Sequence, residues 1–367
     1  MRLDDALNAV HCVPEMFLSL DEPPQIICVV LKQVLTAFGE YAESSPGGLP
    51  EPVQQLFFDL LHFARMADSF GEHSVMNSTR LESSSANTPF KLLQGASTVR
   101  LGIHNAIPAY FLAERFNKVH SAALFSATLL PQHYFLKLLG MPKSTHWIDV
   151  DSPFSAAQLR VAVVHDLTNI YSQRAKALDP MVTIMARVYA KKPGNYLVFS
   201  SSYELLESLL GHFKKAHPHI ACWHQSQNME EAAQTKFIGQ FKPEGKGMGF
   251  AVLGGSFGEG IDLTGSRLVG VFIANLGLAP PTLLNQQIKQ SLASQLSNDF
   301  GESTAYDYAY TYPAMQRVVQ AAGRVIRTLT DTGSVILMDQ RFARPALLQL
   351  MPAWWSIEMI SKNSKEH

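Results

Sequence analysis

Cysteine, net charge and long apolar runs are all scarce in this sequence of 367 residues. Its three cysteines, Cys12, Cys28 and Cys222, are scattered and show no C-x-x-C spacing. They fit reduced thiols in a cytoplasmic protein, or small apolar side chains in a core. Because an iron–sulfur cluster usually takes more cysteine ligands than these three, this chain alone is not expected to hold one.

The formal net charge is −1, from 30 basic and 31 acidic residues, so no overall basic field marks nucleic-acid binding. Any nucleic-acid site is therefore expected to be a local groove. No apolar run approaches the ~20 residues of a membrane-spanning helix. Asp4 and Asp5 stand where a secretory signal has its basic start and apolar core. We expect a cytoplasmic protein with no membrane partner.

Residues 1–97 are predicted to form a helical domain. Apolar residues recur at three- and four-residue steps in Ile26–Phe38 and again in Val53–Met66. The segment between them, Ser44–Pro50, is rich in serine, proline and glycine, as loops are. Residues 73–97 are polar and predict a long loop or a hairpin.

From residue 98 onwards, apolar strands alternate with helices. The predicted strands are Val99–Ile103, Ala122–Phe125, Leu159–Val164, Tyr196–Phe199, His219–Trp223, Gly249–Leu253, Leu268–Ile273 and Ser334–Met338. The predicted helices are Ala109–Asn117, Pro131–Leu139, Pro180–Ala190, Tyr203–Phe213, Glu230–Phe241 and Met315–Arg327. This alternation indicates an α/β fold, with a parallel sheet covered by helices on both faces. Such sheets carry their functional loops at the carboxyl ends of the strands.

The predicted helix Met315–Arg327 carries two arginines among apolar neighbours. Gln320, Arg324 and Arg327 are spaced at i, i+4 and i+7, which places them on one helix face. Gly323 on the same side allows a close approach of another backbone. Arginines on a mostly buried helix need anions, which are either the phosphates of a ligand or carboxylates of the core.

A glycine-rich segment, Gly254–Asp262, directly follows a predicted strand. Backbone amides in such turns can face an anion, although a tight structural turn has the same composition. The segment lacks the Gly-Lys-Ser/Thr ending of a P-loop. The acidic side chains of Glu259 and Asp262 also argue against a simple phosphate cradle.

Two further strand ends carry hydroxyl groups. In Phe125–Leu129, the hydroxyls of Ser126 and Thr128 can relay hydrogen bonds or cap a helix. In Phe199–Tyr203, two serines and a tyrosine suit phosphate and base contacts, or simple capping of the following helix.

In this order the four segments resemble the motifs of superfamily 2 helicases of the XPD/DinG branch. Phe125–Leu129 resembles motif III, the Ser-Ala-Thr segment, and Phe199–Tyr203 resembles motif IV. The segment ending at Asp262 resembles motif V, and Gln320–Arg327 resembles motif VI, Q-x-x-G-R-x-I-R. The resemblance covers about residues 99–350. Smaller matches are Leu138–Met141, Ser152–Phe154, Gly194–Phe199 and Asp339–Phe342.

The resemblance implies a RecA-like second motor domain over residues 151–367. Residues 98–150 would be a remnant of the first motor domain with motif III, and residues 1–97 an arch-like helical domain. The sequence contains no G-x-x-x-x-G-K-[ST] and no Asp-Glu-Ala-His, both of which belong to the first motor domain. The N-terminal helicase domain is therefore expected to be missing from this chain, which alone should be inactive.

The family performs ATP-driven 5′ to 3′ translocation on single-stranded DNA, so the resemblance implies ATP and Mg²⁺, both held mainly by the missing domain, and no metal site here. The residues expected to act on the phosphates are Arg324, Arg327 and Gln320. Those expected nearby at the nucleotide are Asp262, Glu259 and Gly323. Those expected at single-stranded DNA are Ser201, Ser202, Tyr203 and Ser256. Ser126 and Thr128 are expected to couple hydrolysis to domain closure.

Two alternatives remain. The chain can be a non-catalytic module derived from a helicase, which binds nucleic acid or a partner protein. Retention of both Arg324 and Arg327 favours the enzyme, because a module without hydrolysis does not need them. An unrelated α/β phosphate-binding enzyme would require all four motif matches to arise by chance.

Overall fold

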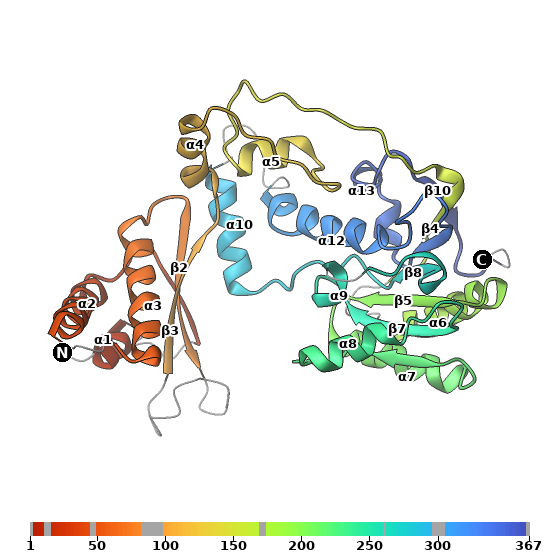
Figure 1. The fold of residues 1–367 in the computed structure, drawn as a ribbon, viewed down its shortest axis with the longest axis horizontal. Coiled ribbons are helices and arrows are strands. Elements are labelled where there is room, and N and C mark those ends of the chain that lie inside the picture. The colour runs from red at the N-terminus through yellow and green to blue at the C-terminus, as the bar shows by residue number, and fades with distance from the viewer. Residues whose placement is uncertain are drawn as a thin grey trace. The chain divides into compact units, whose positions relative to one another are not determined.

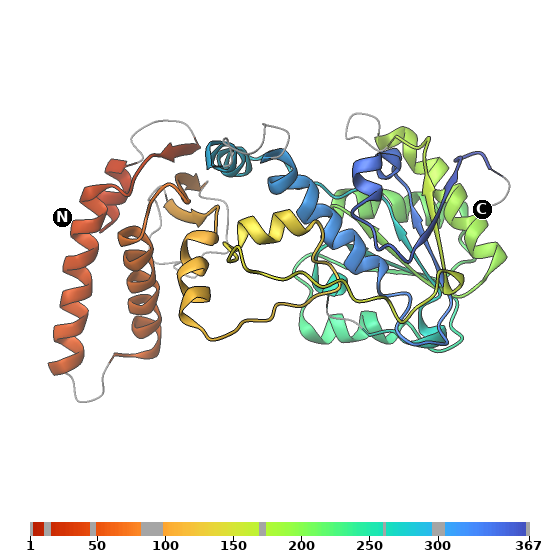
Figure 2. The same ribbon diagram turned by 90° about the horizontal axis from the view of Figure 1, so that it is seen from above.

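The computed structural model describes residues 3–10, 16–44, 49–81, 98–168, 174–259, 262–295 and 305–364. The chain divides into two compact units, drawn in Figures 1 and 2. Unit 1 comprises Met1–Ala122, Phe135–Thr145 and Pro280–Ala309. Unit 2 comprises Ala123–Tyr134, His146–Ala279 and Tyr310–His367. Each unit draws on segments that are distant in the sequence.

Unit 2 is built on a seven-stranded sheet with the strand order β10-β4-β9-β8-β5-β7-β6, in which every pair is parallel. The strands are β4 (Leu159–Val164), β5 (Asn195–Ser200), β6 (Cys222–His224), β7 (Gly247–Val252), β8 (Gly270–Ile273), β9 (Gly333–Leu337) and β10 (Ser356–Ile360). The predicted α/β fold class is confirmed. Strand β10, which was not predicted, extends the sheet at its edge by pairing with β4.

Both faces of this sheet are covered, which explains the continuous apolar strands. On β5, Tyr196 and Val198 belong to the core beneath α6 (Arg174–Lys191) and α7 (Tyr203–Ala216). Leu197 and Phe199 belong to the opposite core, with α8 (Glu231–Gly239) and α12 (Tyr312–Ala322). Figure 1 shows α12 and α7 on opposite sides of the strands. Since alternate side chains of a strand point to opposite faces, a strand covered on both faces is apolar at successive positions instead of at every second one.

Helix α12 ends earlier than predicted. It stops at Ala322 with Gly323 as its C-cap, so Arg324 and Arg327 are not on the helix, and the prediction that they share a helical face was wrong. The backbone amide of Arg327 donates to the carboxylate of Asp331 at 2.8 Å instead of continuing the helical ladder. Such side-chain acceptors compete with helix formation, and a periodicity argument does not take them into account.

The segment Ala122–Phe125 is not a strand, contrary to prediction. Residues 121–126 have no regular secondary structure, and the side chain of Phe125 is 92% exposed. A strand needs a neighbour to pair its backbone groups, and no described strand lies beside this segment. An apolar composition alone therefore did not make this segment a strand.

Unit 1 combines helices with a three-stranded antiparallel sheet, in the order β1-β2-β3. Its helices include α1 (Leu3–Val10), α2 (Gln25–Ser44), α3 (Glu51–Asp68), α4 (Ala109–Lys118) and α10 (Leu283–Gln295), and its strands are β1 (Phe17–Leu20), β2 (Ser74–Leu81) and β3 (Thr98–Asn105). Helices α2 and α3 lie side by side (Figures 1 and 2), as the two apolar periodicities predicted. The sheet means that residues 1–97 are not purely helical.

The predicted boundary between residues 97 and 98 falls inside a strand pair. β3 pairs antiparallel with β2, and residues 82–97 between them lie outside the described residues. Helix α10, which was not predicted, joins this sheet because Gln287 Nε2 donates to the carbonyl of Met76 at 2.9 Å and to Ser19 Oγ at 2.7 Å. Composition did not reveal this pairing, because a strand is placed by its hydrogen-bonding partner.

Candidate functional site

The two arginines lie in a loop at the amino edge of the sheet. Residues 323–332, here called the arginine loop, run from the end of α12 to Gly333, the first residue of β9. Their contacts are with Gly265, which precedes β8, and Gln158, which precedes β4. The expectation that functional loops lie at the carboxyl ends of the strands therefore does not hold for these arginines.

Both arginines contact the motif V segment. The guanidinium of Arg324 donates from Nε and Nη2 to the carbonyl oxygen of Gly258, at 3.1 and 2.9 Å. Gly258 belongs to the short helix α9 (Ser256–Glu259), so this fork joins the arginine loop to motif V.

Arg327 forms an ion pair with Asp262, with Nε 3.6 Å from Oδ1. The two side chains are 35% and 73% exposed, and exposed pairs of this kind contribute only about 0–1 kcal/mol. A phosphate can replace so weak a partner at low cost. Of the other residues expected here, Gln320 is half-buried on α12, whereas the side chain of Glu259 lies outside the described residues.

The sequence analysis missed Asp331, which organises the arginine loop. Its buried carboxylate accepts hydrogen bonds from the backbone amides of Arg327 and Thr328, both at 2.8 Å, and of Gly265 at 3.2 Å. Burial by itself would raise the pKa of this carboxyl, but these hydrogen bonds outweigh burial and lower the pKa. The sequence signal that could have revealed this turn is the Asp-x-Gly tripeptide between a helix and a strand.

The candidate DNA residues lie at the opposite, carboxyl edge of the sheet, and the side chains of Ser201, Ser202 and Tyr203 are engaged within the protein. Ser202 Oγ accepts from the amide of Leu205 at 3.3 Å, so it caps α7. Ser201 is paired with buried Asn275, which follows β8. Asn275 Nδ2 donates to Ser201 Oγ at 2.7 Å, and its Oδ1 accepts from the Ser201 amide at 3.1 Å.

Tyr203 is tied to the end of β7, just before motif V, through a second missed residue, Gln225. The buried Gln225 donates from Nε2 to Tyr203 Oη at 3.0 Å and accepts at Oε1 from the amide of Val252 at 2.9 Å. Gln225 and Asn275 each follow closely on an apolar strand. Their position after a strand is the signal that could have revealed them, because it lies at the edge where parallel sheets carry their sites.

The motif V segment connects the two edges. It leaves the carboxyl end of β7 at Gly254, where φ is +77° and an added Cβ would lie 2.6 Å from Arg317 Cδ, so glycine is required there. Ser256 is exposed at the start of α9, and Asp262 then pairs with the arginine loop at the amino edge. The motif V segment therefore has residues at both edges of the sheet, Ser256 at the carboxyl edge and Asp262 at the amino edge.

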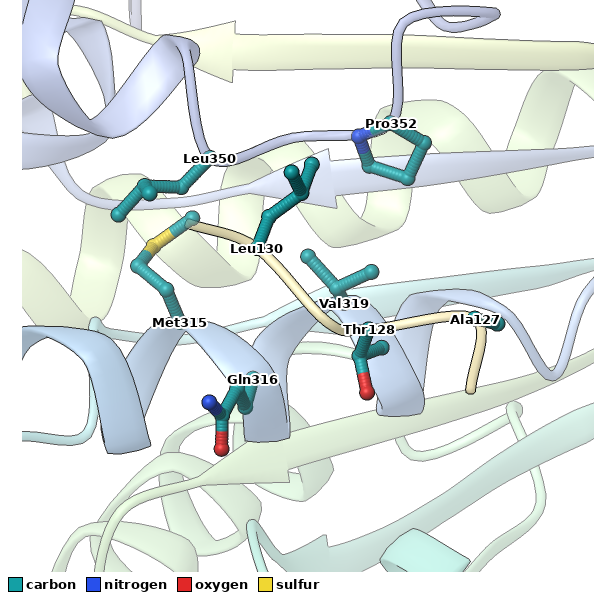
Figure 3. Close-up of a pocket in the computed structure, with 8 residues that line it drawn as sticks. All are labelled: Ala127, Thr128, Leu130, Met315, Gln316, Val319, Leu350 and Pro352. Atoms are coloured by element: carbon teal, nitrogen blue, oxygen red, sulfur yellow. The ribbon is translucent and has the colours of Figure 1, made fainter. Parts of the chain in front are cut away.

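The Ser-Ala-Thr segment lies against α12. Ser126 Oγ and Thr128 Oγ1 are 3.2 Å apart, and the Thr128 amide donates to Ser126 Oγ at 3.2 Å, so these hydroxyls close a local turn. Figure 3 shows the segment crossing α12, the helix that leads into the arginine loop. The residues that line this small pocket are Ala127, Thr128, Leu130, Met315, Gln316, Val319, Leu350 and Pro352.

Comparison with known proteins identifies the unit that carries these loops. A family profile described as a helicase C-terminal domain matches residues 185–358. A probable ATP-dependent helicase of Methanocaldococcus jannaschii is 28% identical over 218 residues, which are 56% of this chain and 32% of that protein. The ATP-dependent DNA helicase XPD of Sulfolobus acidocaldarius is 23% identical over 250 residues, 66% of this chain and 43% of that protein. Nearly half of this chain thus resembles the C-terminal domain of helicases, and its sequence relatives include XPD.

Solved XPD helicase structures share the fold. One aligns with a TM-score of 0.62 at 18% identity, and the match covers 97% of this chain but 60% of that chain. This chain thus spans less than half the length of the two sequence relatives and about three fifths of the structural one. The RecA-like class that the motif order implied is confirmed by this likeness.

Metal and membrane sites were also considered in the described part of the chain. There, no group of three or more His, Cys, Asp or Glu side chains is placed to hold a metal ion. No helix in the same residues combines the length and the apolar composition that a bilayer crossing requires.

Proposed function

We propose that this chain is the C-terminal part of an ATP-dependent DNA helicase that moves 5′ to 3′ along single-stranded DNA. The observation that carries the proposal is the arginine loop, in which Arg324 and Arg327 are both held against motif V. Planar guanidinium groups match phosphate oxygens and stabilise the charge that develops during phosphoryl transfer. In this proposal Arg327 exchanges Asp262 for a phosphate of ATP.

The residues present fit half of an ATP site. Arg324 and Arg327 offer cationic donors at the amino edge, and Gln320 lies one turn before the end of α12. The phosphate-binding lysine and the acidic residues that hold Mg²⁺ would come from the first motor domain. When bound, ATP supplies the phosphoryl group whose transfer drives movement, and this chain contributes charge and positioning.

Exposed apolar side chains support the proposal that a first motor domain covers part of unit 2. Phe125, Ile148 and Val150 are 92%, 79% and 87% exposed, in two extended segments that lack sheet neighbours. Large apolar side chains that are left exposed in segments without sheet neighbours are suited to being covered by a further domain. We assign residues 98–150 to the remnant of that domain, residues 151–367 to the second motor domain, and the preceding residues to an arch-like domain.

Single-stranded DNA would lie along the carboxyl edge. Ser256 is exposed there, whereas the side chains of Ser201, Ser202 and Tyr203 mainly shape the edge. Ser126 and Thr128, whose segment packs against α12, would transmit domain closure to the arginine loop. Binding should be independent of sequence and weaken as salt rises.

The test is a comparison of the isolated chain with the full-length protein. The full-length protein should unwind duplexes with a 5′ single-stranded tail, hydrolyse ATP and respond to DNA. The isolated chain should bind single-stranded DNA weakly and show no DNA-stimulated hydrolysis. Robust hydrolysis by the isolated chain, or a full-length protein that binds DNA but never hydrolyses ATP, would instead favour the alternative of a different enzyme or of a non-catalytic binding module.

A further inference from the structure

The arginine loop is held by two side chains that belong to none of the helicase motifs. The carboxylate of Asp331 accepts hydrogen bonds from the backbone amides of Arg327, Thr328 and Gly265. Gln158 Nε2 donates to two backbone carbonyls of the same loop, those of Leu329 at 3.0 Å and Asp331 at 3.1 Å. The same Nε2 lies 3.4 Å from the carbonyl oxygen of Thr328.

The bonds of Asp331 join the two segments that carry the Arg327–Asp262 ion pair. Arg327 donates its own amide to Oδ2, and Gly265, three residues after Asp262, donates to Oδ1. Gly265 adopts φ +64°, a conformation that glycine alone adopts without strain. One buried carboxylate therefore sets the separation of the backbones on which the arginine and its anionic partner stand.

Gln158 is itself oriented before it reaches the loop. It ends the short helix η1 (Ala156–Gln158), where its Oε1 accepts from the amide of Ser155 at 3.0 Å in a capping box. That leaves Nε2 directed at the loop carbonyls. Ser155 follows Ser152–Phe154, the stretch through which the chain enters the sheet of unit 2, so the loop is coupled to the position of this entry segment.

We infer that Asp331 and Gln158 are positioning residues that hold the Arg327 guanidinium in register with the transferring phosphate. This inference rests on the proposed function, because it assigns the register of the same arginine. A pre-set guanidinium stabilises developing charge without reorganising, and misplacement of a catalytic group by about 1 Å can lower the rate by about 10²-fold. Neither side chain needs to touch the nucleotide for this effect.

The decisive variant is Asp331→Asn in the full-length protein. An amide cannot accept on both sides, so its NH₂ would face either Gly265 or the amides of Arg327 and Thr328. We expect the turnover number for ATP hydrolysis to fall about tenfold or more, with little change in the Kd for single-stranded DNA without nucleotide. Amide hydrogen exchange in residues 323–332 should rise in the same variant.

The matched control is Asp166→Asn. Asp166 also has a lowered pKa and also binds protein groups, accepting from Ser361 Oγ and the Lys362 amide, both at 2.7 Å, but at the far end of β4. It should reduce the melting temperature without altering turnover or hydrogen exchange in the arginine loop. If the two variants change turnover equally, general destabilisation explains both and the inference is overturned.

A double-mutant cycle separates positioning from structure. In an Arg327→Lys background, Asp331→Asn should have a much smaller effect on turnover, because both changes act through one guanidinium. Equal factors in both backgrounds overturn the inference. If Asp331→Asn fails to fold, Gln158→Ala carries the same cycle with an expected decrease of about threefold, since its side chain is only half-buried.

The outcomes also separate this inference from the proposed function. If Arg327→Ala leaves hydrolysis intact, the proposed function fails. If Arg327→Ala abolishes hydrolysis while Asp331→Asn and Gln158→Ala match the unmodified protein in turnover and in loop exchange, only the inference fails.

Discussion

The two edges of the parallel sheet hold their loops in different ways. At the carboxyl edge, polar side chains bond to one another, as Ser201 does with Asn275 and Tyr203 with Gln225. At the amino edge, Asp331 and Gln158 bond to the backbone and leave the Arg327 side chain about a third exposed. The first arrangement gives a rigid surface, and the second presents a charged side chain on a rigid loop. A surface suits a DNA backbone that slides, whereas a presented charge suits a phosphate that reacts.

The largest effect should come from removing the presented charge. We expect Arg327→Ala in the full-length protein to lower the ATPase rate by roughly 10²-fold or more, since arginine fingers contribute about 10³- to 10⁵-fold elsewhere. DNA binding without nucleotide should barely change, because the candidate DNA residues lie at the other edge. Steady-state kinetics beside a melting curve checks this. A large drop in melting temperature with a parallel loss of DNA binding would mean that the arginine holds the fold.

Acidification should weaken the amino edge through Asp331. Its pKa is lowered in the fold, so its contribution to stability is present above the ordinary carboxyl pKa of about 3.9 and is lost as the pH falls through the lowered value. Near pH 7, Asp331→Asn should lower the free energy of unfolding by roughly 2–3 kcal/mol, because backbone amides lose a charged hydrogen-bond acceptor. Denaturant unfolding at a series of pH values should show the two proteins converging in acid. A constant difference across the series would contradict this account.

At the carboxyl edge, Gln225→Ala should lower the free energy of unfolding by roughly 1–3 kcal/mol. The substitution removes the acceptor of the Val252 amide and the donor to Tyr203. Tyr203→Phe is the matched control, since it removes only one of those two bonds and should cost less. Single-strand binding should weaken in Gln225→Ala, and the ATPase rate at saturating DNA should change less. Unfolding curves and fluorescence anisotropy with labelled DNA measure both. If Gln225→Ala lowers the ATPase rate at saturating DNA as much as Arg327→Ala does, DNA binding and ATP hydrolysis are not assigned to separate edges of the sheet.

The smallest effect is expected from Ser202→Ala. Loss of the N-cap of α7 should cost about 1 kcal/mol, and the Kd for single-stranded DNA should stay close to that of the unmodified protein. Ser256→Ala is the useful comparison, because Ser256 is exposed at the same edge. If Ser202→Ala weakens DNA binding more than Ser256→Ala does, the serine hydroxyl is a DNA contact as well as a cap.

Much of unit 2 was predictable from the order of residues along the chain. The strand Leu159–Val164 was predicted at its observed bounds, and β5, β7 and β9 were predicted to within two residues at each end. Buried parallel strands are the easiest elements to recognise, because both faces demand apolar side chains. The four motif segments were likewise found, although their roles at the site remain predictions.

Errors occurred where a partner distant in the sequence decides the outcome. Ala122–Phe125 has the composition of a strand but no neighbour, whereas β3 has a neighbour that assigns it to unit 1. The arginine loop was predicted as helix up to Arg327 because Asp331, four residues further on, was not considered as an acceptor for the amide of Arg327. These are competitions for hydrogen bonds, which local propensity does not resolve.

The sequence by itself thus determined the fold class, the identity of the charged groups and their order, since apolar periodicity and residue type are local properties. The tertiary structure alone decided that Arg324 and Arg327 stand on a loop at the amino edge, with Gly258 and Asp262 as their partners. It also placed Asp331, Gln158, Gln225 and Asn275, whose importance depends on groups up to about 170 residues away in the chain. The physical reason is that a hydrogen bond depends on distance in space, which the chain reaches only when the sheet has formed.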